Sequence, residues 1–338
     1  MNRRTVESNG IRISLLEAGQ GPLVVLLHGF PELGYSWRHQ ISALAQAGFH
    51  AVAPDQRGYG LSTIPERADE YTLCHLAGDI VGLVRALGER QAAVIGHDWG
   101  AGVAWTCALL RPDIFPAVAL LSVPYLAGLW SGPPPTFLMK QLLSVGQMFY
   151  QLYFQEPGKA DREMAQDPRD FLLRIFAGAA GGVPPEQRWR WMFNPSERLL
   201  DTLPPVDRMP AWLEAEDLDF FAAEFARTGF TGGLNWYRNM DRSRELLAFL
   251  AGARISQPSA FLAGEDDAVI QMYRADYDTL EQTMPGLTAK TLIPGAGHWV
   301  QQEKPGEVNQ WLLRFLSEAW PAQRDRESNL QEAIWQHR

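Results

Sequence analysis

Short apolar runs alternate with amphipathic stretches along most of the chain. Mostly apolar runs of four or five residues, typical of strands buried on both faces of a sheet, occupy residues 23–27, 50–53, 92–95, 117–121, 259–263 and 289–293. Between them, the spacing of apolar residues predicts helices over 36–46, 73–87, from about 100 to 111, and over 308–320. This alternation predicts an α/β fold, a mostly parallel central sheet flanked by helices.

Three segments depart from the alternation. Residues 4–8 and 11–15 flank Asn9-Gly10, a pair typical of a type I′ hairpin turn. Residues 128–239 are rich in aromatic residues, Pro and Gly and carry helix-like stretches without a parallel-strand signal, which predicts a helical cap domain inserted into one core domain of residues 1–127 and 240–320. Residues 321–338 are polar and charged; we expect a tail, or a helix packed on the body or on a second subunit, which leaves a homodimer open.

Composition excludes several classes of protein. The net charge is −9 and no block of Lys and Arg occurs, which argues against a nucleic-acid partner. The first ten residues hold no apolar segment of a secretory signal, and no apolar run approaches the roughly 18 residues of a membrane span. The two cysteines, Cys74 and Cys107, lack metal-type spacing and fit free thiols in a reducing compartment. We therefore expect a cytoplasmic protein without membrane contact.

The most informative stretch surrounds Asp98. The apolar strand at 92–95 runs into Gly96-His97-Asp98-Trp99-Gly100, and a helical pattern follows. Small residues two positions before and after a polar residue, between a strand and a helix, are what a nucleophile elbow requires. A carboxylate in place of the usual serine suits attack on a saturated carbon, which gives an alkyl ester that water can cleave. The alternative is a tight glycine turn with an exposed aspartate.

Two later loops supply partners for such a nucleophile. The loop after the 259–263 strand reads Gly264-Glu265-Asp266-Asp267, and the loop after the 289–293 strand contains His298. Nucleophile, then acid, then histidine is the chain order of the α/β-hydrolase fold, whose catalytic loops follow the carboxyl ends of strands. Spacing alone does not separate Glu265, Asp266 and Asp267 as the acid.

Taken together, these motifs resemble the epoxide hydrolases of the α/β-hydrolase superfamily over nearly the whole chain. The likeness rests on the segments 28–32 (HGFPE), 96–100 (GHDWG) and 295–299 (GAGHW) and on two tyrosines of the insertion. It implies Asp98 as nucleophile, His298 as the base that activates water, and Asp267, third after the glycine, as the acid that orients it.

The resemblance also implies the remaining site residues. Two cap tyrosines should protonate the leaving oxygen, and the match falls on Tyr153, with Tyr150 as the alternative, and on Tyr237. The backbone N–H groups of Phe30 and Trp99 should form an oxyanion hole, and Phe30, Pro31 and Trp99 should contact substrate. A cis bond is expected between Phe30 and Pro31. His28 and His97 are expected to be scaffold residues.

The expected reaction is hydrolysis of an epoxide to a vicinal diol, with no metal and no organic cofactor. A haloalkane or haloacid dehalogenase shares the scaffold. Haloalkane dehalogenases usually carry Asn where Phe30 stands, and fluoroacetate dehalogenases typically carry Arg where Trp99 stands, which argues against both. A non-catalytic relative is the third reading, and the complete set of Asp98, Asp267 and His298 argues against it.

Overall fold

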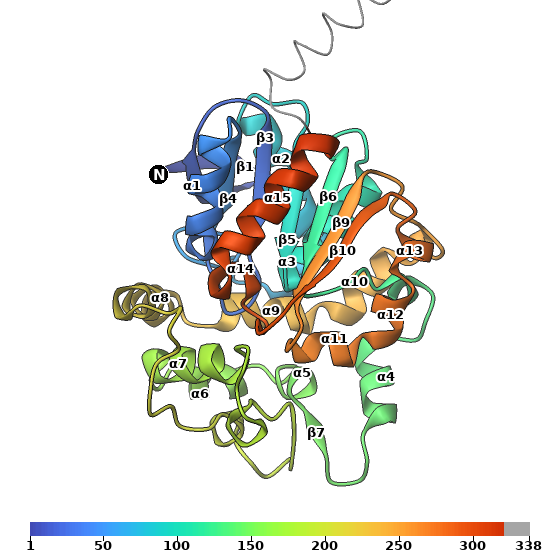
Figure 1. Ribbon diagram of the computed structural model, residues 1–338. Helices are drawn as coiled ribbons and strands as arrows, with labels where there is room; N and C mark the ends of the chain where they lie inside the picture. The colour runs from blue at the N-terminus through green and yellow to red at the C-terminus, as the bar shows by residue number, and fades with distance from the viewer. Residues whose placement is uncertain (321–338) are drawn as a thin grey trace, which may run out of the picture.

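The computed structural model describes residues 1–320, and an eight-stranded sheet forms its centre, in the order β1-β2-β4-β3-β5-β6-β9-β10 (Figure 1). The strands are β1 (Asn2–Ser8), β2 (Ile11–Ala18), β3 (Leu23–Leu27), β4 (His50–Pro54), β5 (Ala93–His97), β6 (Ala117–Leu121), β9 (Ser259–Gly264) and β10 (Leu287–Ile293). From β4 to β10 all neighbouring strands pair in parallel. The predicted α/β fold with a mostly parallel sheet is confirmed.

The N-terminal hairpin forms the antiparallel edge of the sheet. Strand β1 pairs antiparallel with β2, and β2 pairs antiparallel with β4. Asn9 and Gly10 connect β1 to β2, and both have positive φ angles, 50° and 79°. A type I′ turn needs this conformation at both central positions, and Asn and Gly adopt it with the least strain, so the expected turn is confirmed.

Helices cover both faces of the sheet. They are α1 (Arg38–Gln46) and α15 (Pro305–Ala319) on one face and α2 (Leu73–Ala86) and α3 (Trp99–Leu110) on the other. Along β3, Val24 and Leu26 join the core under α1 and α15, whereas Val25 and Leu27 join the core under α2 and α3. Side chains of a strand alternate between faces, so a strand buried on both faces has to be apolar throughout.

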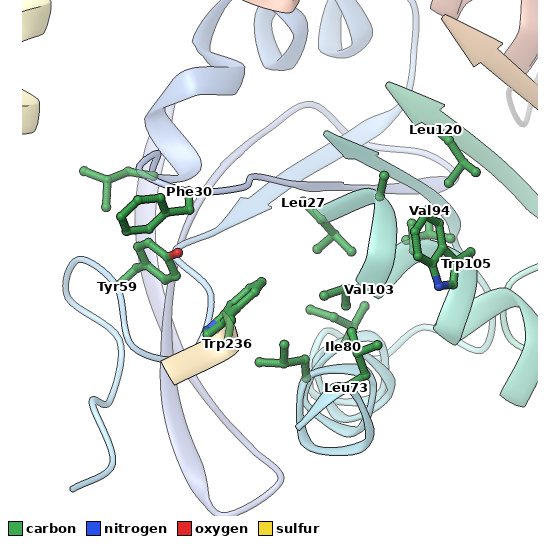
Figure 2. Close-up of a cluster of buried hydrophobic side chains, with 14 of the residues drawn as sticks. Leu27, Phe30, Tyr59, Leu73, Ile80, Val94, Val103, Trp105, Leu120 and Trp236 are labelled. Atoms are coloured by element: carbon green, nitrogen blue, oxygen red, sulfur yellow. The ribbon is translucent and has the colours of Figure 1, made fainter. Parts of the chain in front are cut away.

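The second of these cores extends from the sheet to the inserted segment. Figure 2 shows Leu27 and Val94 of the sheet, Ile80 of α2 and Val103 of α3 in one buried cluster. Trp236, which belongs to the insertion, packs edge-on against Tyr59 with ring centroids 5.4 Å apart. Apolar packing therefore joins the insertion to the sheet domain.

The insertion between β6 and β9 lies beyond the carboxyl ends of the strands (Figure 1). Its elements are α4 (Pro135–Leu142), β7 (Met148–Phe149), α5 (Tyr150–Tyr153), α6 (Lys159–Met164), α7 (Pro168–Gly178), β8 (Met192–Phe193), α8 (Ala215–Thr228) and α9 (Thr231–Arg238), and α10 (Met240–Leu246) follows it in the sheet domain. Strands β7 and β8 form a short antiparallel pair. The remaining helices of the sheet domain are α11 (Ala268–Met272), α12 (Arg274–Asp278), α13 (Leu280–Thr283) and α14 (Val300–Glu303).

Helix boundaries differ from expectation by a few residues. Helix α1 begins at Arg38 because the preceding residues Gly34–Trp37 form a turn of 3₁₀-helix. Helix α15 begins at Pro305, three residues earlier than expected, because proline suits the first turn of a helix. Among residues 1–320, none of the helices is both long and apolar enough to cross a bilayer. The tail expected over 321–338 falls outside the described residues.

Candidate active site

Asp98 stands at the turn between β5 and α3, with a φ angle of 53° that side-chain-bearing residues rarely adopt. A Cβ atom on Gly96 would lie 2.0 Å from the carbonyl oxygen of Gly100, and one on Gly100 would lie 2.1 Å from the carbonyl oxygen of Leu27. Glycine at both positions is therefore a steric requirement. The turn holds the Asp98 carboxylate at the carboxyl end of the central strand.

The carboxylate of Asp98 is held by one backbone donor and faces one imidazole. The Phe30 N–H donates to Oδ1 over 2.9 Å, and Nε2 of His298 lies 3.6 Å from Oδ2. Burial by itself raises the pKa of this carboxyl, but the contributions of His298, His97 and the Phe30 amide outweigh burial and lower it. Asp98 is therefore ionised at neutral pH, as a nucleophile must be.

Among the three acidic candidates after β9, only Asp267 contacts His298. Its two carboxylate oxygens lie 3.2 and 3.3 Å from Nδ1 of His298, and Asp267 is 1% exposed. Asp266 instead accepts the N–H of Gly182 in the insertion, and Glu265 is exposed. The Asp267 carboxylate faces Nδ1, so the Nε2 side of the ring is the one directed at Asp98.

The charge state of His298 follows from its two carboxylate neighbours. Burial acts to lower its pKa, but Asp267 and Asp98 together raise the pKa well above the usual histidine range. The ring is therefore an imidazolium in the resting protein, and the carboxylates of Asp267 and Asp98 stabilise its positive charge.

Two features of the backbone at Phe30 and Trp99 bear on the expected oxyanion hole. The Phe30–Pro31 peptide bond is cis. The Phe30 N–H points at the Asp98 carboxylate, and Trp99 is the first residue of α3, where a backbone N–H has no acceptor within the helix. The Phe30 amide thus lies beside the Asp98 carboxylate, and the Trp99 amide stays a prediction for the second donor of the oxyanion hole.

Two phenols of the insertion line the same cavity as Asp98 and His298. They are Tyr150, at the start of α5, and Tyr237, in α9. The Gln155 side chain holds the two helices together, since its Nε2 donates to the carbonyl oxygens of Gln151 and Tyr237 over 2.9 and 3.0 Å. Burial and the nearby carboxylate of Asp98 raise the pKa of both phenols well above their usual range. Both hydroxyls are therefore protonated at neutral pH.

The expected position of Tyr153 is wrong. Tyr153 lies at the other end of α5 and does not line the cavity; its hydroxyl donates to Glu163 of α6, and Lys159 Nζ lies 4.3 Å from the ring centre. The hydrogen bond to Glu163 of α6 holds the Tyr153 hydroxyl outside the cavity. Tyr150, the alternative, occupies the position beside Asp98.

The side chain of Trp99 also departs from expectation. Its ring packs edge-on against Tyr237, with centroids 5.0 Å apart, and against Trp236 at 6.0 Å, and it does not line the cavity. Phe30 and Pro31 do line it. The Trp99 indole is therefore placed to support the Tyr237 phenol rather than to contact a substrate directly.

The rest of the cavity wall is mainly apolar. Besides the residues already placed, it consists of Phe154, Phe171, Ile175, Gly178, Ala179, Ala180, Arg188, Trp189, Trp191, Leu199, Ala268, Val269 and Trp299. Arg188 and Asp266 are its charged members outside the central group of Asp98, Asp267 and His298. Within residues 1–320, no three His, Cys, Asp or Glu side chains cluster as a metal site requires.

Comparison with known proteins agrees with this geometry. The family model for the alpha/beta hydrolase fold matches residues 22–305. Epoxide hydrolase A of Mycobacterium tuberculosis is 47% identical over 316 residues, which cover 93% of this chain and 97% of the relative. The chain belongs to the epoxide hydrolases of the α/β-hydrolase fold.

Solved structures of this family agree over the same length. The structure described as an epoxide hydrolase from an endophytic Streptomyces superposes with a TM-score of 0.90 at 45% identity and covers 94% of this chain and 95% of its own. Epoxide hydrolase A from Mycobacterium thermoresistibile gives a TM-score of 0.86 at 49% identity and covers 93% and 98%.

A buried network that the sequence did not reveal supports the epoxide hydrolase site from behind. Nδ1 of His97 lies 2.7 Å from Oε2 of Glu32, and Nε2 of His97 lies 2.7 Å from the carbonyl oxygen of His298; both side chains are fully buried. The His97 ring therefore connects Glu32 to the backbone of the His298 loop. The position of Glu32 in the HGFPE segment was the available signal, but its partners are distant in sequence.

The same network reaches the insertion. Glu32 accepts a hydrogen bond from Gln302, whose Oε1 accepts one from Arg38, and Arg38 forms a 2.6 Å ion pair with Asp217 of α8. Glu303 adds a second link, because it accepts the N–H groups of Gly181 in the insertion and of Gly297 and Trp299 on either side of the base. The His298 loop is thus tied to both parts of the fold.

Proposed function

We propose that this protein hydrolyses an epoxide to a vicinal diol through a covalent ester on Asp98. The observation that supports this best is that a nucleophile and two proton donors line one cavity. The Asp98 carboxylate and the His298 ring line it from the sheet domain, and the phenols of Tyr150 and Tyr237 line it from the insertion. A nucleophile for carbon thus shares the cavity with two proton donors for oxygen, which ring opening requires.

In the first step, Asp98 attacks one ring carbon in line with the carbon–oxygen bond. A bond forms between the carboxylate oxygen and that carbon, and the electron pair of the breaking bond stays on the ring oxygen. Tyr150 or Tyr237 transfers its proton to this oxygen, which becomes the first hydroxyl of the product. Both phenols are neutral at neutral pH because burial and Asp98 raise their pKa, so both are able to donate.

Ester formation changes the chemistry of His298. In the resting protein the charge of Asp98 is one of two charges that raise the pKa of His298. The ester has no charge, so its formation removes that contribution and lowers the pKa of the ring. An imidazolium that had stabilised the nucleophile thereby becomes able to release its proton and to act as a base.

In the second step, neutral His298 takes a proton from a water molecule, which attacks the carbonyl carbon of the ester. Asp267, 3.2 Å from Nδ1, orients the ring and stabilises the imidazolium that forms. The Phe30 and Trp99 amides stabilise the tetrahedral oxyanion. Its collapse breaks the ester bond, and the leaving alkoxide takes the proton of the carboxyl group that forms on Asp98, which gives the diol and regenerates the Asp98 carboxylate. The phenolate left by the first step regains, by exchange through solvent, the proton that His298 released before it acted as a base.

The proposed substrates are uncharged epoxides with an apolar alkyl or aryl substituent. Phe154, Phe171, Trp189 and Trp191 line the cavity beyond the reacting groups, and such walls favour apolar surface. The insertion over 128–239 serves as the cap that encloses this substituent and supplies both phenols.

We also propose a cytoplasmic location, which the free thiols of Cys74 and Cys107 support, because disulfides are rare there. A homodimer is the assembly to test, and the exposed apolar side chains of Phe137 and Leu142 on α4 favour it. Sedimentation of the purified full chain measures this directly; a monomer at micromolar concentration contradicts the dimer.

The test of the function is diol formation from a panel of styrene-type and aliphatic epoxides, run beside haloalkanes of matching size. We expect diols from the epoxides and no halide release. A single turnover in isotopically labelled water, with enzyme in excess, should yield a diol without label, because its new oxygen comes from Asp98. Label in the diol under these conditions contradicts the ester, and halide release without diol formation would establish the dehalogenase instead.

A further inference from the structure

The residue that follows Tyr150 places an amide on its hydroxyl. Nε2 of Gln151 donates a hydrogen bond to Oη of Tyr150 over 2.9 Å, and Gln151 is 7% exposed. We propose that Gln151 is a positioning residue for ring opening, which leaves the Tyr150 proton available to the cavity and stabilises the phenolate as that proton departs. This inference rests on the proposed function.

The direction of the hydrogen bond carries the argument. An amide N–H only donates, so the Tyr150 oxygen is the acceptor, and its own single proton remains for another oxygen. Tyr150 lines the cavity beside Asp98, whereas Gln151 does not line it. Gln151 therefore binds the Tyr150 oxygen from outside the cavity, and the Tyr150 proton remains available on the side where an epoxide oxygen would lie.

The same contact matters more as charge develops. Burial raises the pKa of Tyr150, which makes the phenol a weaker acid, and the Gln151 donor acts in the opposite direction. Tyr237 has a comparable neighbour, since burial raises its pKa and the Trp99 side chain opposes the rise. Each of the two phenols thus has one N–H group that stabilises its ionised form.

The surroundings of the amide favour this orientation. The Gln151 amide also affects the phenol of Tyr273. Burial raises the pKa of Tyr273 to about 12, and a hydrogen bond with Gln151 acts to lower that pKa. Oε1 of Gln151 is buried and has no hydrogen-bond partner among the described residues. In the reverse orientation the amide nitrogen would take that place, and two unpaired buried N–H groups cost more than one unpaired carbonyl oxygen. The donor therefore belongs on the phenols.

Two substitutions test the proposal. Gln151→Met keeps the length of the side chain and removes the donor, whereas Gln151→Glu replaces the donor by an acceptor that competes for the Tyr150 proton. Each is made alone and together with Tyr150→Phe, and rapid mixing with a styrene-type epoxide measures ester formation and ester hydrolysis separately. Gln166→Glu, exposed on the cap outside the cavity, is the control for the same change of charge.

We expect Gln151→Met to slow ester formation by about ten- to a hundredfold, the effect of losing one hydrogen bond to a charged group. Gln151→Glu should slow it further, ester hydrolysis should be unchanged, and Gln166→Glu should match the unsubstituted protein. In the Tyr150→Phe background neither Gln151 variant should add a further loss, because the hydroxyl that Gln151 positions is absent.

Three results would overturn the inference. One is an equal loss from the Gln151 variants with and without the Tyr150 hydroxyl, which indicates a merely structural role. Another is ring opening by Gln151→Glu at the unsubstituted rate, which shows that the amide accepts rather than donates. If Gln151→Glu does not fold, Gln151→Met and its double variant carry the test alone. Unchanged ring opening in Tyr150→Phe itself would instead refute the role of Tyr150 in the proposed function, and the inference with it.

Discussion

Replacing Gly29 by alanine should disable the nucleophile while leaving every catalytic side chain in the sequence. A Cβ atom added to Gly29 would lie 2.2 Å from Oδ1 and 2.4 Å from Cβ of Asp98. Non-bonded contacts of a Cβ atom below 3.0 Å essentially never occur, so the two residues would have to separate. The backbone of Gly29 has no positive φ angle, so the effect is steric and acts on Asp98 itself.

The size of the effect follows from the overlap. Relieving it requires a movement of nearly 1 Å between the Asp98 carboxylate and the loop that carries Phe30, whose N–H donates to the same oxygen over 2.9 Å. A misplacement of about 1 Å at a reacting group costs about a hundredfold in rate, or about 2.7 kcal/mol in the activation free energy. Overpacking of a dense site adds about 1–3 kcal/mol of destabilisation.

Rapid mixing of the Gly29→Ala protein with a styrene-type epoxide measures ester formation, and thermal unfolding measures stability. The matched control is Gly306→Ala, because a Cβ atom there meets no atom within 4 Å and alanine suits the first turn of α15. We expect the control to keep its rate. A folded Gly29→Ala protein that forms ester as fast as the unsubstituted protein would refute the placement of Asp98 as the attacking group.

Further predictions follow from the other side chains of the site. His298→Gln should form the ester but cleave it about 10²–10⁴-fold more slowly, since glutamine takes no proton from water. Intact-protein mass spectrometry should then show a gain equal to the mass of the epoxide. Normal turnover of this variant would contradict the assignment of His298 as the base. Tyr150→Phe should slow ester formation by about 10²–10⁴-fold, the contribution typical of a general acid. Tyr153→Phe should barely change the rate, because the Tyr153 hydroxyl binds Glu163 and Tyr153 does not line the cavity. Equal losses in the two variants would refute this distinction. Because His298 and its neighbours lower the pKa of Asp98 against the effect of burial, ester formation should stay constant as the pH falls to roughly the usual aspartate range near 3.9, and the acid limb should move to higher pH in His298→Gln. An acid limb at the same pH in both proteins would show that His298 does not stabilise the charge of Asp98.

The sequence by itself determined the elements whose signal is local. Strands buried on both faces have to be continuously apolar, and β3 and β6 occupy the residues that this rule predicts. The Asn9-Gly10 turn and the elbow at Asp98 depend on positive φ angles and on small neighbours, which single residue types reveal. Because parallel strands bring their carboxyl ends to one edge, the order of these elements also predicted that Asp98, the acidic loop and His298 would meet.

Only the tertiary structure decided between neighbouring candidates. Tyr150 and Tyr153 belong to one four-residue helix, and a turn that short has no apolar stripe to show which side faces the core. The choice depends on packing with distant segments: Glu163 of α6 binds the hydroxyl of Tyr153, and the cavity receives that of Tyr150. Contacts with distant segments also distinguish Asp266 from Asp267. Asp266 accepts the N–H of Gly182 in the insertion, whereas Asp267 lies beside Nδ1 of His298. Side-chain direction in short turns is set by contacts between remote parts of the chain, and local sequence does not encode them.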